Sequence, residues 1–563
     1  MEGASLGEGG VKAAEIQVMN LDHLGLVAGI IDEIGLVEQI DQLLGQDNRE
    51  KVSAGLVVKA MILNGLGFVS APLYLFSRFF EGKATEHLIG AGVKPEHLND
   101  DRLGRVLDGL FLAGLSSCFV SIAMKAIAKF EVSIETAHLD STSFHLHGQY
   151  ETANDEVVVT QKSEDGTRVE IEVAPKAIHV TYGYSRDHRS DLKQFVMNLI
   201  CGGEGGIPLF LEMADGNQDD KTKFAHLFEE FQKQWTFEGV HIADSALYTA
   251  DNLKRMKQLK WVTRVPLTLN EAKQVLVEVS EDEWVESSLK GYWIVERSSN
   301  YGGVEQRWLI VKSLARQQSD QKQLQKKVLK SQQQSIKQLQ KLSAQEFSCE
   351  PDARMAARQF SSQLKYHTLE AVEIIEQDHY SQPGRPAKQT RPTHKTYHIQ
   401  ATLVVNKTVL EQQRQQAGRF ILATNVLDKE QLNNDALLSE YKQQQSTERG
   451  FSFLKDPLFF ADSVFLKDPG RIAAVGMVMG LCLLVYNLGQ TALRQALVQA
   501  ARSLPNQLKK PTQRPTLRWI FQCFQSVHLL IIDGVKQIAN LTDERLEILR
   551  FFSQACRDYY LLC

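Results

Sequence analysis

Residues 134 to 265 constrain the fold most, because the hydrophobic pattern changes there from helical spacing to short runs of β-type residues. Glycine and aspartate or asparagine clusters separate several of these runs. A helix-like stretch, residues 219–234, lies between the fourth run and the fifth. Strands in series, then a helix, then further strands indicate an α/β fold. The predicted strands are residues 136–144, 177–184, 195–200, 208–213, 240–244 and 261–265.

Helical spacing dominates on both sides of this segment. Apolar residues recur at steps of three and four positions through residues 27–40, and Ser53 and Asn99 stand where helix N-caps are expected. We therefore predict a helical N-terminal domain over residues 1–130 and the first part of an α/β core over residues 131–267. From Asp435 the helical pattern returns, which predicts the final core helices over residues 431–500 and a basic helical region over residues 501–563.

Residues 268–430 are predicted to form an insertion domain of mixed strands and helices. Strand-like runs occupy residues 292–297, 307–312 and 397–405. Residues 317–345 are rich in Gln and Lys with a partial apolar stripe, which fits a solvated helix or short coiled-coil arm, or else a disordered segment. The proline-containing basic stretch at residues 383–395 is predicted to be an extended loop.

Composition limits the class of protein further. A chain of 563 residues is long enough for three or four domains. Its seven cysteines are scattered without a Cys-x-x-Cys pair, which favours reduced cysteines in the cytoplasm over a disulfide framework or a zinc site. Residues 472–488 carry no charge but include Gly476, Gly480 and Asn487, so we interpret them as a buried core helix rather than a membrane span.

Two of the predicted strands carry an aspartate. Asp140 lies within an apolar run and Asp244 ends another, each followed by small residues. A buried carboxylate costs several kcal/mol unless it is paired or bound to metal. Ligands also gather at the carboxyl ends of strands in α/β sheets. Both residues are therefore candidate metal ligands, with an exposed strand face for Asp140 and a helix N-cap for Asp244 as the alternatives.

A third candidate carboxylate belongs to a polar stripe near the C-terminal part of the chain. Gln444, Glu448 and Lys455 follow Tyr441 by three, seven and fourteen positions. At about 100° per residue, one helix would place all four within roughly 60° of one another. Taken alone, the stripe is typical of a solvated helix face. Beside two strand aspartates, Glu448 becomes a candidate third ligand and Lys455 a candidate contact for a phosphate.

Three carboxylates together point to metal-dependent phosphoryl transfer. Magnesium prefers oxygen ligands, and two ions about 4 Å apart can activate the attacking oxygen and stabilise the leaving one. Water as the nucleophile gives strand cleavage, and a DNA 3′-hydroxyl gives strand joining. We predict Asp140, Asp244 and Glu448 as both catalytic residues and ligands of two Mg²⁺ ions, with Mn²⁺ as a substitute.

These residues resemble the bacterial insertion-sequence transposases of the DDE class, whose third-acid region is written Y-(2)-R-(3)-E-(6)-K. The sequence keeps this spacing from Tyr441 to Lys455 but has Gln444 where the pattern has arginine. The resemblance extends to residues 183–194, 263–266 and 418–425. It implies an RNase H-like core, an insert between the second aspartate and the glutamate, Mg²⁺ dependence, cut-and-paste movement of DNA and a homodimer. Residues predicted to contact DNA are Tyr441, Gln444, Lys455, Arg186, Arg189 and Lys193.

The formal net charge of −5 means that contacts with double-stranded DNA must come from local basic patches. Three exist, at residues 312–341, 385–395 and 502–518, and we expect at least one to touch DNA. The helical N-terminal domain either binds DNA ends or serves as a scaffold or dimer surface. Two other functions stay open: a nuclease that cuts without joining, and a catalytically silent DNA-binding protein.

Overall fold

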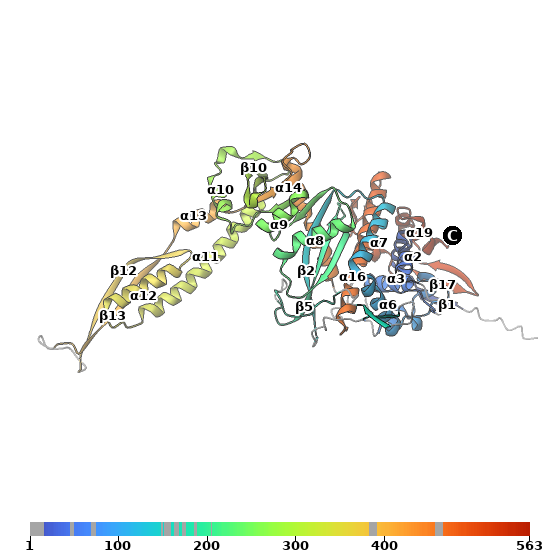
Figure 1. Cartoon of the computed structure of the whole chain (residues 1–563), viewed down its shortest axis with the longest axis horizontal. Coiled ribbons are helices and arrows are strands. Elements are labelled where there is room, and N and C mark those ends of the chain that lie inside the picture. Colours follow the sequence, from blue (N-terminus) through green and yellow to red (C-terminus); the bar gives the residue numbers. More distant parts are fainter. Residues whose placement is uncertain are drawn as a thin grey trace, which may run out of the picture. The chain divides into compact units, whose positions relative to one another are not determined.

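The computed structural model describes residues 16–45, 50–68, 72, 75–147, 150, 159–162, 168–171, 176–184, 189–203, 205–381, 391–456 and 466–562. The chain divides into two compact units, each described by itself below (Figure 1). Unit 1 comprises Met1–Thr263, Gly302–Val304 and Ser439–Cys563, and unit 2 comprises Arg264–Tyr301 and Glu305–Leu438.

A mixed β-sheet forms the centre of unit 1, in the strand order β6-β5-β2-β7-β8. Strand β5 is antiparallel to both β2 and β6, whereas β7 is parallel to both β2 and β8. The predicted α/β class is confirmed. The strands are β2 (Thr136–Leu146), β5 (Lys193–Gly202), β6 (Ile207–Ala214), β7 (Val240–Ala243) and β8 (Trp261–Arg264), and a separate pair is formed by β3 (Val159–Lys162) and β4 (Arg168–Ile171).

Helices cover both faces of this sheet. On one face, α16 (Pro469–Gln499) packs so closely that a Cβ atom at Gly476 would lie 2.6 Å from the sulfur of Met213. On the other face, α8 (Asp220–Gln234) packs the ring of Phe231 edge-on against Phe210 of β6. Because Phe210 and Met213 point to opposite sides of β6, the two helices enclose the sheet between them (Figure 1).

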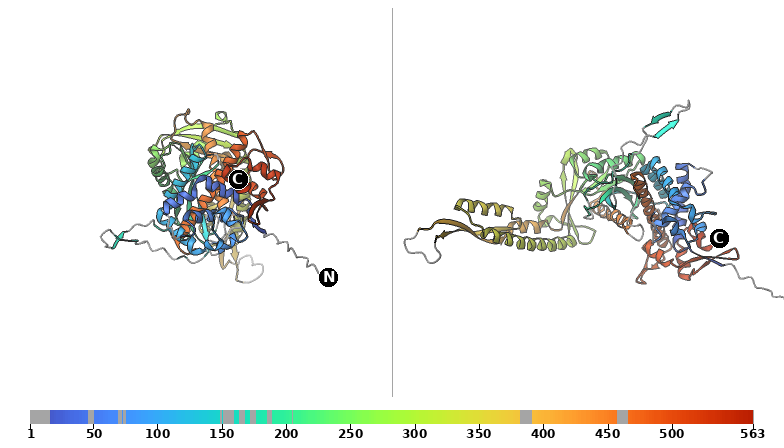
Figure 2. Two further views of the ribbon diagram at one scale, coloured as in Figure 1. Left: turned by 90° about the vertical axis from the view of Figure 1, so that its right-hand side faces the viewer. Right: turned by 90° about the horizontal axis from the view of Figure 1, so that it is seen from below.

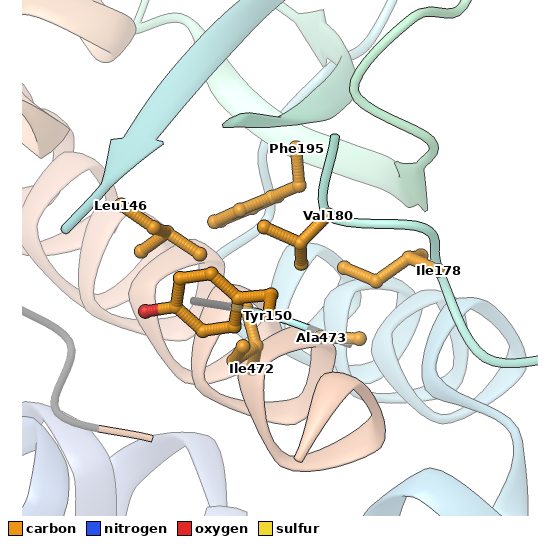
Figure 3. Close-up of a cluster of buried hydrophobic side chains, with 7 residues drawn as sticks. All are labelled: Leu146, Tyr150, Ile178, Val180, Phe195, Ile472 and Ala473. Atoms are coloured by element: carbon orange, nitrogen blue, oxygen red, sulfur yellow. The ribbon is translucent and has the colours of Figure 1, made fainter. Parts of the chain in front are cut away.

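The apolar run predicted as a buried core helix lies within α16. This helix is long and apolar enough to cross a membrane, yet 89% of its most apolar 18-residue window is buried inside the protein. Its first turns join a cluster at the end of β2 and β5, where Ile472 and Ala473 meet Leu146, Tyr150 and Phe195 (Figure 3). The helix therefore carries a large part of the core of unit 1.

The N-terminal part of unit 1 is helical, as predicted, with Ser53 and Asn99 capping α3 and α6. Its helices are α1 (Leu24–Ile34), α2 (Leu36–Leu44), α3 (Ala54–Gly65), α4 (Phe76–Phe80), α5 (Thr85–Leu88), α6 (Asp100–Ala113) and α7 (Leu115–Lys129). The stripe at residues 27–40 is divided between α1 and α2, because Gly35 adopts a left-handed conformation with φ of 69°.

The C-terminal region is not purely helical, so that prediction is wrong. Strands β17 (His528–Ile532) and β18 (Val535–Ala539) form a hairpin, and β17 also pairs with β1 (Ile16–Asn20). Asp533 and Gly534 connect the strands with φ of 48° and 84°, the conformation that favours Asp-Gly in two-residue hairpin turns. The remaining elements are α17 (Leu517–Cys523), α18 (Asp543–Leu549), α19 (Gln554–Leu561) and the short pair β15 (Leu504–Pro505) and β16 (Pro511–Thr512).

A second prediction also fails: of residues 177–184, those from 177 to 180 and 182 to 184 form no strand, and Thr181 makes only an isolated bridge to Gln194. Gln194 also donates through its side chain to the carbonyls of Tyr184 and Gly216. These bonds hold the segment against β5 without the regular pairing of a ladder, which explains why its apolar alternation misled the prediction.

Unit 2 contains an antiparallel sheet in the order β14-β11-β10-β9, with Trp308 of β11 buried to 1% exposure. The segment predicted as a helix or a disordered arm is one 30-residue helix, α11. Residues 383–390 of the predicted loop lie outside the described residues, whereas His394 and Lys395 belong to a strand. The elements are α10 (Asn270–Glu278), β9 (Val285–Glu286), β10 (Tyr292–Ser299), β11 (Gln306–Ser313), α11 (Leu314–Ser343), α12 (Glu350–Gln363), β12 (His367–His379), β13 (His394–Val405), α13 (Lys407–Gln416) and β14 (Arg419–Thr424).

Candidate active site

Asp140 and Asp244 lie at matching positions on neighbouring strands. Strands β2 and β7 run parallel, with Leu139 opposite Ala243, so the next residue along each chain segment is an aspartate: Asp140 within β2 and Asp244 directly after β7. Neighbouring strands lie about 4.8 Å apart, and residues in register point their side chains to the same face. The parallel pairing thus brings together two carboxylates that are 104 positions apart in the sequence.

Local hydrogen bonds fix the backbone around both aspartates. The Oδ1 atom of Asp140 accepts from the amide of Ser141 at 2.8 Å, and that of Asp244 accepts from the amide of Ala246 at 2.8 Å. The hydroxyl of Thr263 on β8 donates to the carbonyl of Asp244 at 2.6 Å. Both aspartates are half-buried. Two carboxylates this close repel one another, which favours a cation between them.

The predicted single helix from Tyr441 to Lys455 is interrupted. Tyr441 lies in α14 (Asn434–Gln443), Glu448 lies in α15 (Gln445–Leu454), and Lys455 follows the end of α15. Between the helices, the amide of Gln444 donates to the carbonyl of Tyr441, a bond across three residues rather than four. This tighter turn changes the angular spacing, so the stripe derived from 100° per residue was wrong across this junction.

Helix α15 lies against the face of the sheet that carries Asp140. Gln444 is only 8% exposed, and its side chain donates to the carbonyl of Leu139 at 3.4 Å. Thr447 is fully buried beside Cys201 of β5. Burial raises the pKa of the Cys201 thiol to about 12, and the nearby charge of Asp140 adds to the effect. Asp140, Cys201 and Thr447 therefore share one interface between sheet and helix.

Glu448 is placed on this helix but is exposed to solvent. Among the residues that the structure describes, no group of three or more His, Cys, Asp or Glu side chains is close enough to hold a metal ion. The structure thus brings Asp140 and Asp244 together and puts Glu448 on the adjoining helix, without gathering all three carboxylates.

Lys455 contacts the same face farther along β2. Its ammonium lies 5.7 Å from the ring centroid of Phe144, which stacks on Phe195 at 5.4 Å. Phe144 is four residues beyond Asp140, a distance of roughly 13 Å along a strand. Lys455 therefore contacts β2 at a position that marks the margin of the site.

The other predicted DNA contacts have different surroundings. Arg189 forms a two-bond ion pair with Asp191, with both distances 2.9 Å, and Lys193 donates to the carbonyl of Tyr150 at 2.6 Å. Arg186 lies outside the described residues. Tyr441 is half-buried in α14. The partners of Arg189 and Lys193 satisfy part of their hydrogen-bonding capacity within the protein.

Comparison with known proteins decides the family. Residues 134–488 match the family described as transposase DDE domain, and residues 16–124 match a domain of unknown function, DUF4277. The chain belongs to the DDE transposase family. No curated protein matches it. Among solved structures, it is similar to a piggyBac transposase in a synaptic complex with hairpin DNA, with 9% sequence identity, a TM-score of 0.36, and coverage of 97% of this chain and 84% of that one.

Sequence reasoning missed the residues that position the site in this DDE transposase. Thr263 sits in the stretch 263–266 that the resemblance covers, but it was given no role there, and Thr447, just before Glu448, belongs to no recognised spacing. A polar residue inside a buried strand was the available signal for Thr263, since such a group needs a partner. Thr263 finds it in the carbonyl of Asp244.

Gln444 is expected to position α15 rather than to contact DNA. Replacing it with methionine keeps the volume but removes the amide that bonds to Leu139, so the cleavage rate should fall roughly fivefold, the value of one ordinary hydrogen bond. The dissociation constant for DNA should be unchanged. Gln443→Met, one position away, where the side chain donates to Glu440, is the matched control and should be neutral. A weakened affinity for DNA at an unchanged turnover rate would instead assign Gln444 to DNA contact.

Proposed function

We propose that this DDE transposase catalyses DNA strand cleavage and strand transfer in the movement of an insertion sequence. The observation that carries the proposal is the parallel register of β2 and β7, which puts Asp140, within β2, opposite Asp244, the first residue after β7. Both residues lie within the segment that matches the transposase DDE domain. The carboxyl ends of strands are where α/β sheets bind their ligands.

The side chains present fit a hard divalent cation. Asp140, Asp244 and Glu448 offer only oxygen donors, which Mg²⁺ and Mn²⁺ accept, and the repulsion between the two aspartates is relieved when a cation binds. Glu448 is exposed at the edge of α15, so its side chain retains rotational freedom to turn toward them. When bound, two such ions polarise the phosphodiester and lower the pKa of the attacking hydroxyl.

The remaining residues of the site position the carboxylates, helix α15 and the DNA. Thr263 fixes the backbone of Asp244, and Gln444 and Thr447 hold α15 against β2 and β5. Lys455 carries a positive charge at the margin, where the phosphate of a neighbouring nucleotide can bind. Positioning and neutralisation of charge account for most of the catalysis in phosphoryl transfer, so these supporting contacts matter as much as the ligands.

An assay with the DNA ends of the element tests the proposal. The full chain is incubated with labelled terminal duplexes and a supercoiled target in Mg²⁺, in Mn²⁺ and in EDTA. We expect end cleavage and joined products with either metal and neither product in EDTA. Cleavage without joining at all target concentrations would favour the nuclease, which needs the same carboxylates but no binding of a second DNA molecule.

The third function, a catalytically silent DNA-binding protein, is favoured by one observation: the described residues gather no group of three metal-ligating side chains. Calorimetry separates this function from the enzyme, because a transposase must bind Mg²⁺ or Mn²⁺ at the aspartate pair and a silent protein need not.

We further propose that the protein is a homodimer and lies in the cytoplasm. The six described cysteines are all free thiols, in keeping with a reducing compartment, and two transposon ends require two active sites.

A further inference from the structure

Helix α11 of unit 2 presents a row of lysines along one side. Taking about 100° and 1.5 Å per residue, five of its lysines fall within roughly 100° of one another and span about 28 Å of helix. All five are exposed. They are Lys322, Lys326, Lys330, Lys337 and Lys341, hereafter the lysine row.

The opposite side of α11 is the side that packs. Leu324 is 8% exposed and Ser335 is 5% exposed, and both lie roughly 160° from the centre of the lysine row. Leu342, near the end of the helix, packs against the cluster of Ala353, Ala357 and Ile399 between α12 and the β12-β13 hairpin. Figure 2 shows α11 running beside this hairpin. The lysine row thus faces away from the rest of unit 2.

The lysine row keeps its positive charge. Within the described part of the chain, none of its five ammonium groups forms an ion pair. The C-terminal basic patch differs, because Arg502 pairs with Glu547 and Arg518 pairs with Asp456. The third patch, in the loop before β13, lies mostly outside the described residues. The lysine row therefore leaves all five of its charges for a partner, whereas two arginines of the C-terminal patch are already paired.

We propose that the lysine row of unit 2 binds the phosphate backbone of duplex DNA. The proposal rests on the proposed function in that DNA is taken as the substrate. Lysines four residues apart lie about 6 Å apart along the helix, and a duplex presents one charge per roughly 1.7 Å of its axis. Every ammonium in the row can therefore find a phosphate along a stretch of about eight base pairs.

The chemistry of the row fits the backbone rather than the bases. Lysine is a flexible point charge without the planar fork that reads a guanine edge. Between the lysines, this face of α11 carries glutamines such as Gln333 and Gln340, which can donate to phosphate oxygens. No aromatic residue lies in α11, so stacking on unpaired bases is absent. Binding should thus be independent of sequence and prefer duplex over single strands.

The salt dependence of DNA binding tests this proposal. The variant replaces all five lysines of the row with glutamine, which has nearly the same helix propensity and should leave α11 folded. Affinity for a 40-base-pair duplex of arbitrary sequence is measured between 50 and 200 mM salt in EDTA, with the full chain. The slope of log K against log salt should decrease in magnitude by about 0.9 for each lysine that contacts a phosphate, up to roughly 4.5.

A matched control removes the same net charge elsewhere. It carries lysine-to-glutamine changes at five exposed positions outside α11, and its slope should change by less than about one unit. The control positions are Lys51, Lys94, Lys125, Lys254 and Lys273. If the row variant keeps the wild-type slope, or changes it no more than the control does, the proposal is overturned. A changed oligomeric state with an unchanged slope would likewise overturn it and assign the row to a protein partner.

Failure of this proposal and failure of the proposed function give different results. Because the binding measurement is made in EDTA, it does not depend on cleavage. If the carboxylates are not catalytic, Asp140→Asn keeps its cleavage rate while the row variant still loses slope. If the row does not bind DNA, Asp140→Asn loses cleavage while the row variant keeps its slope.

Discussion

Asp140→Asn is expected to reduce the rate of DNA end cleavage on the order of 10³-fold or more, which corresponds to about 4 kcal/mol of lost transition-state stabilisation. Asparagine keeps the shape of the side chain and the oxygen that accepts from the Ser141 amide, but it removes the negative charge that would hold a cation. Asp244→Asn should have an effect of the same size, because its carboxylate starts from the matching position on β7. Single-turnover cleavage measures both.

The same variants should fold normally, which separates a catalytic effect from a structural one. In the absence of metal, two neighbouring carboxylates repel one another, so removing either charge should leave the melting temperature unchanged or raise it. Millimolar Mg²⁺ should stabilise the wild-type protein but neither variant, since a ligand stabilises only a state that binds it. Differential scanning fluorimetry with and without Mg²⁺ gives this readout independently of activity.

Glu212→Gln is the matched control for these substitutions. Glu212 lies on β6 of the same sheet but on the opposite face from the aspartates, where burial raises its pKa. Removing its charge should leave both the cleavage rate and the stabilisation by Mg²⁺ intact. A wild-type cleavage rate for Asp140→Asn and Asp244→Asn together would show that the catalytic carboxylates had been assigned to the wrong residues.

The sequence was sufficient to predict the two aspartates as candidate ligands, because each is a charged residue within or next to an apolar strand. A charged residue in or at the end of an apolar strand is recognisable without any partner, and parallel pairing of β2 and β7 then brings the two together. The third acid was harder. Its predicted position assumed an unbroken helix, and the three-residue bond at Gln444 shows that the packing of α15 on the sheet overrides ideal helical spacing.

The predicted DNA contacts could not be judged from sequence, because the charge of a side chain does not specify whether its partner is DNA or the protein itself. The sequence presents Arg189 and Lys193 as basic residues near a turn, but the neighbouring Asp191 and the Tyr150 carbonyl bind them in the folded chain.

The β17-β18 hairpin was missed although Asp533-Gly534 is a strong turn signal, because only five residues flank it on each side. Short strands give too few alternations to outweigh the helical pattern of their surroundings.

The N- and C-terminal parts of unit 1 meet at a position where the packing of the helices leaves room only for glycine. A Cβ atom added to Gly29 of α1 would lie 2.4 Å from the Cα atom of Cys556 in α19, too close for any real contact. The tyrosine one turn later in α19 completes the junction, as the Tyr560 hydroxyl donates to the carbonyl of Asp22 at 2.6 Å and accepts from the amide of Leu26. The close approach of these helices depends on the missing side chain.

Gly29→Ala should therefore lower the free energy of unfolding by about 2 kcal/mol, the cost of forcing an extra methyl group into a packed interface. Gly109→Ala is the matched control. It makes the same change inside α6, where the nearest atom to the new Cβ would be the flexible Leu44 side chain at 3.5 Å. There the higher helix propensity of alanine should stabilise the protein by up to about 1 kcal/mol.

Hydrogen exchange locates the effect of Gly29→Ala, since local opening reports the stability of individual elements. Amides of α19 and of the first turns of α1 should exchange faster in this variant, by a larger factor than those of β2 and β5, which report only the loss of global stability. Gly109→Ala should accelerate the exchange of neither set. Equal protection of α19 in both variants would mean that α1 and α19 accommodate the extra methyl group without a loss of stability. In that case the backbone approach at Cys556 would not hold the two ends of the chain together.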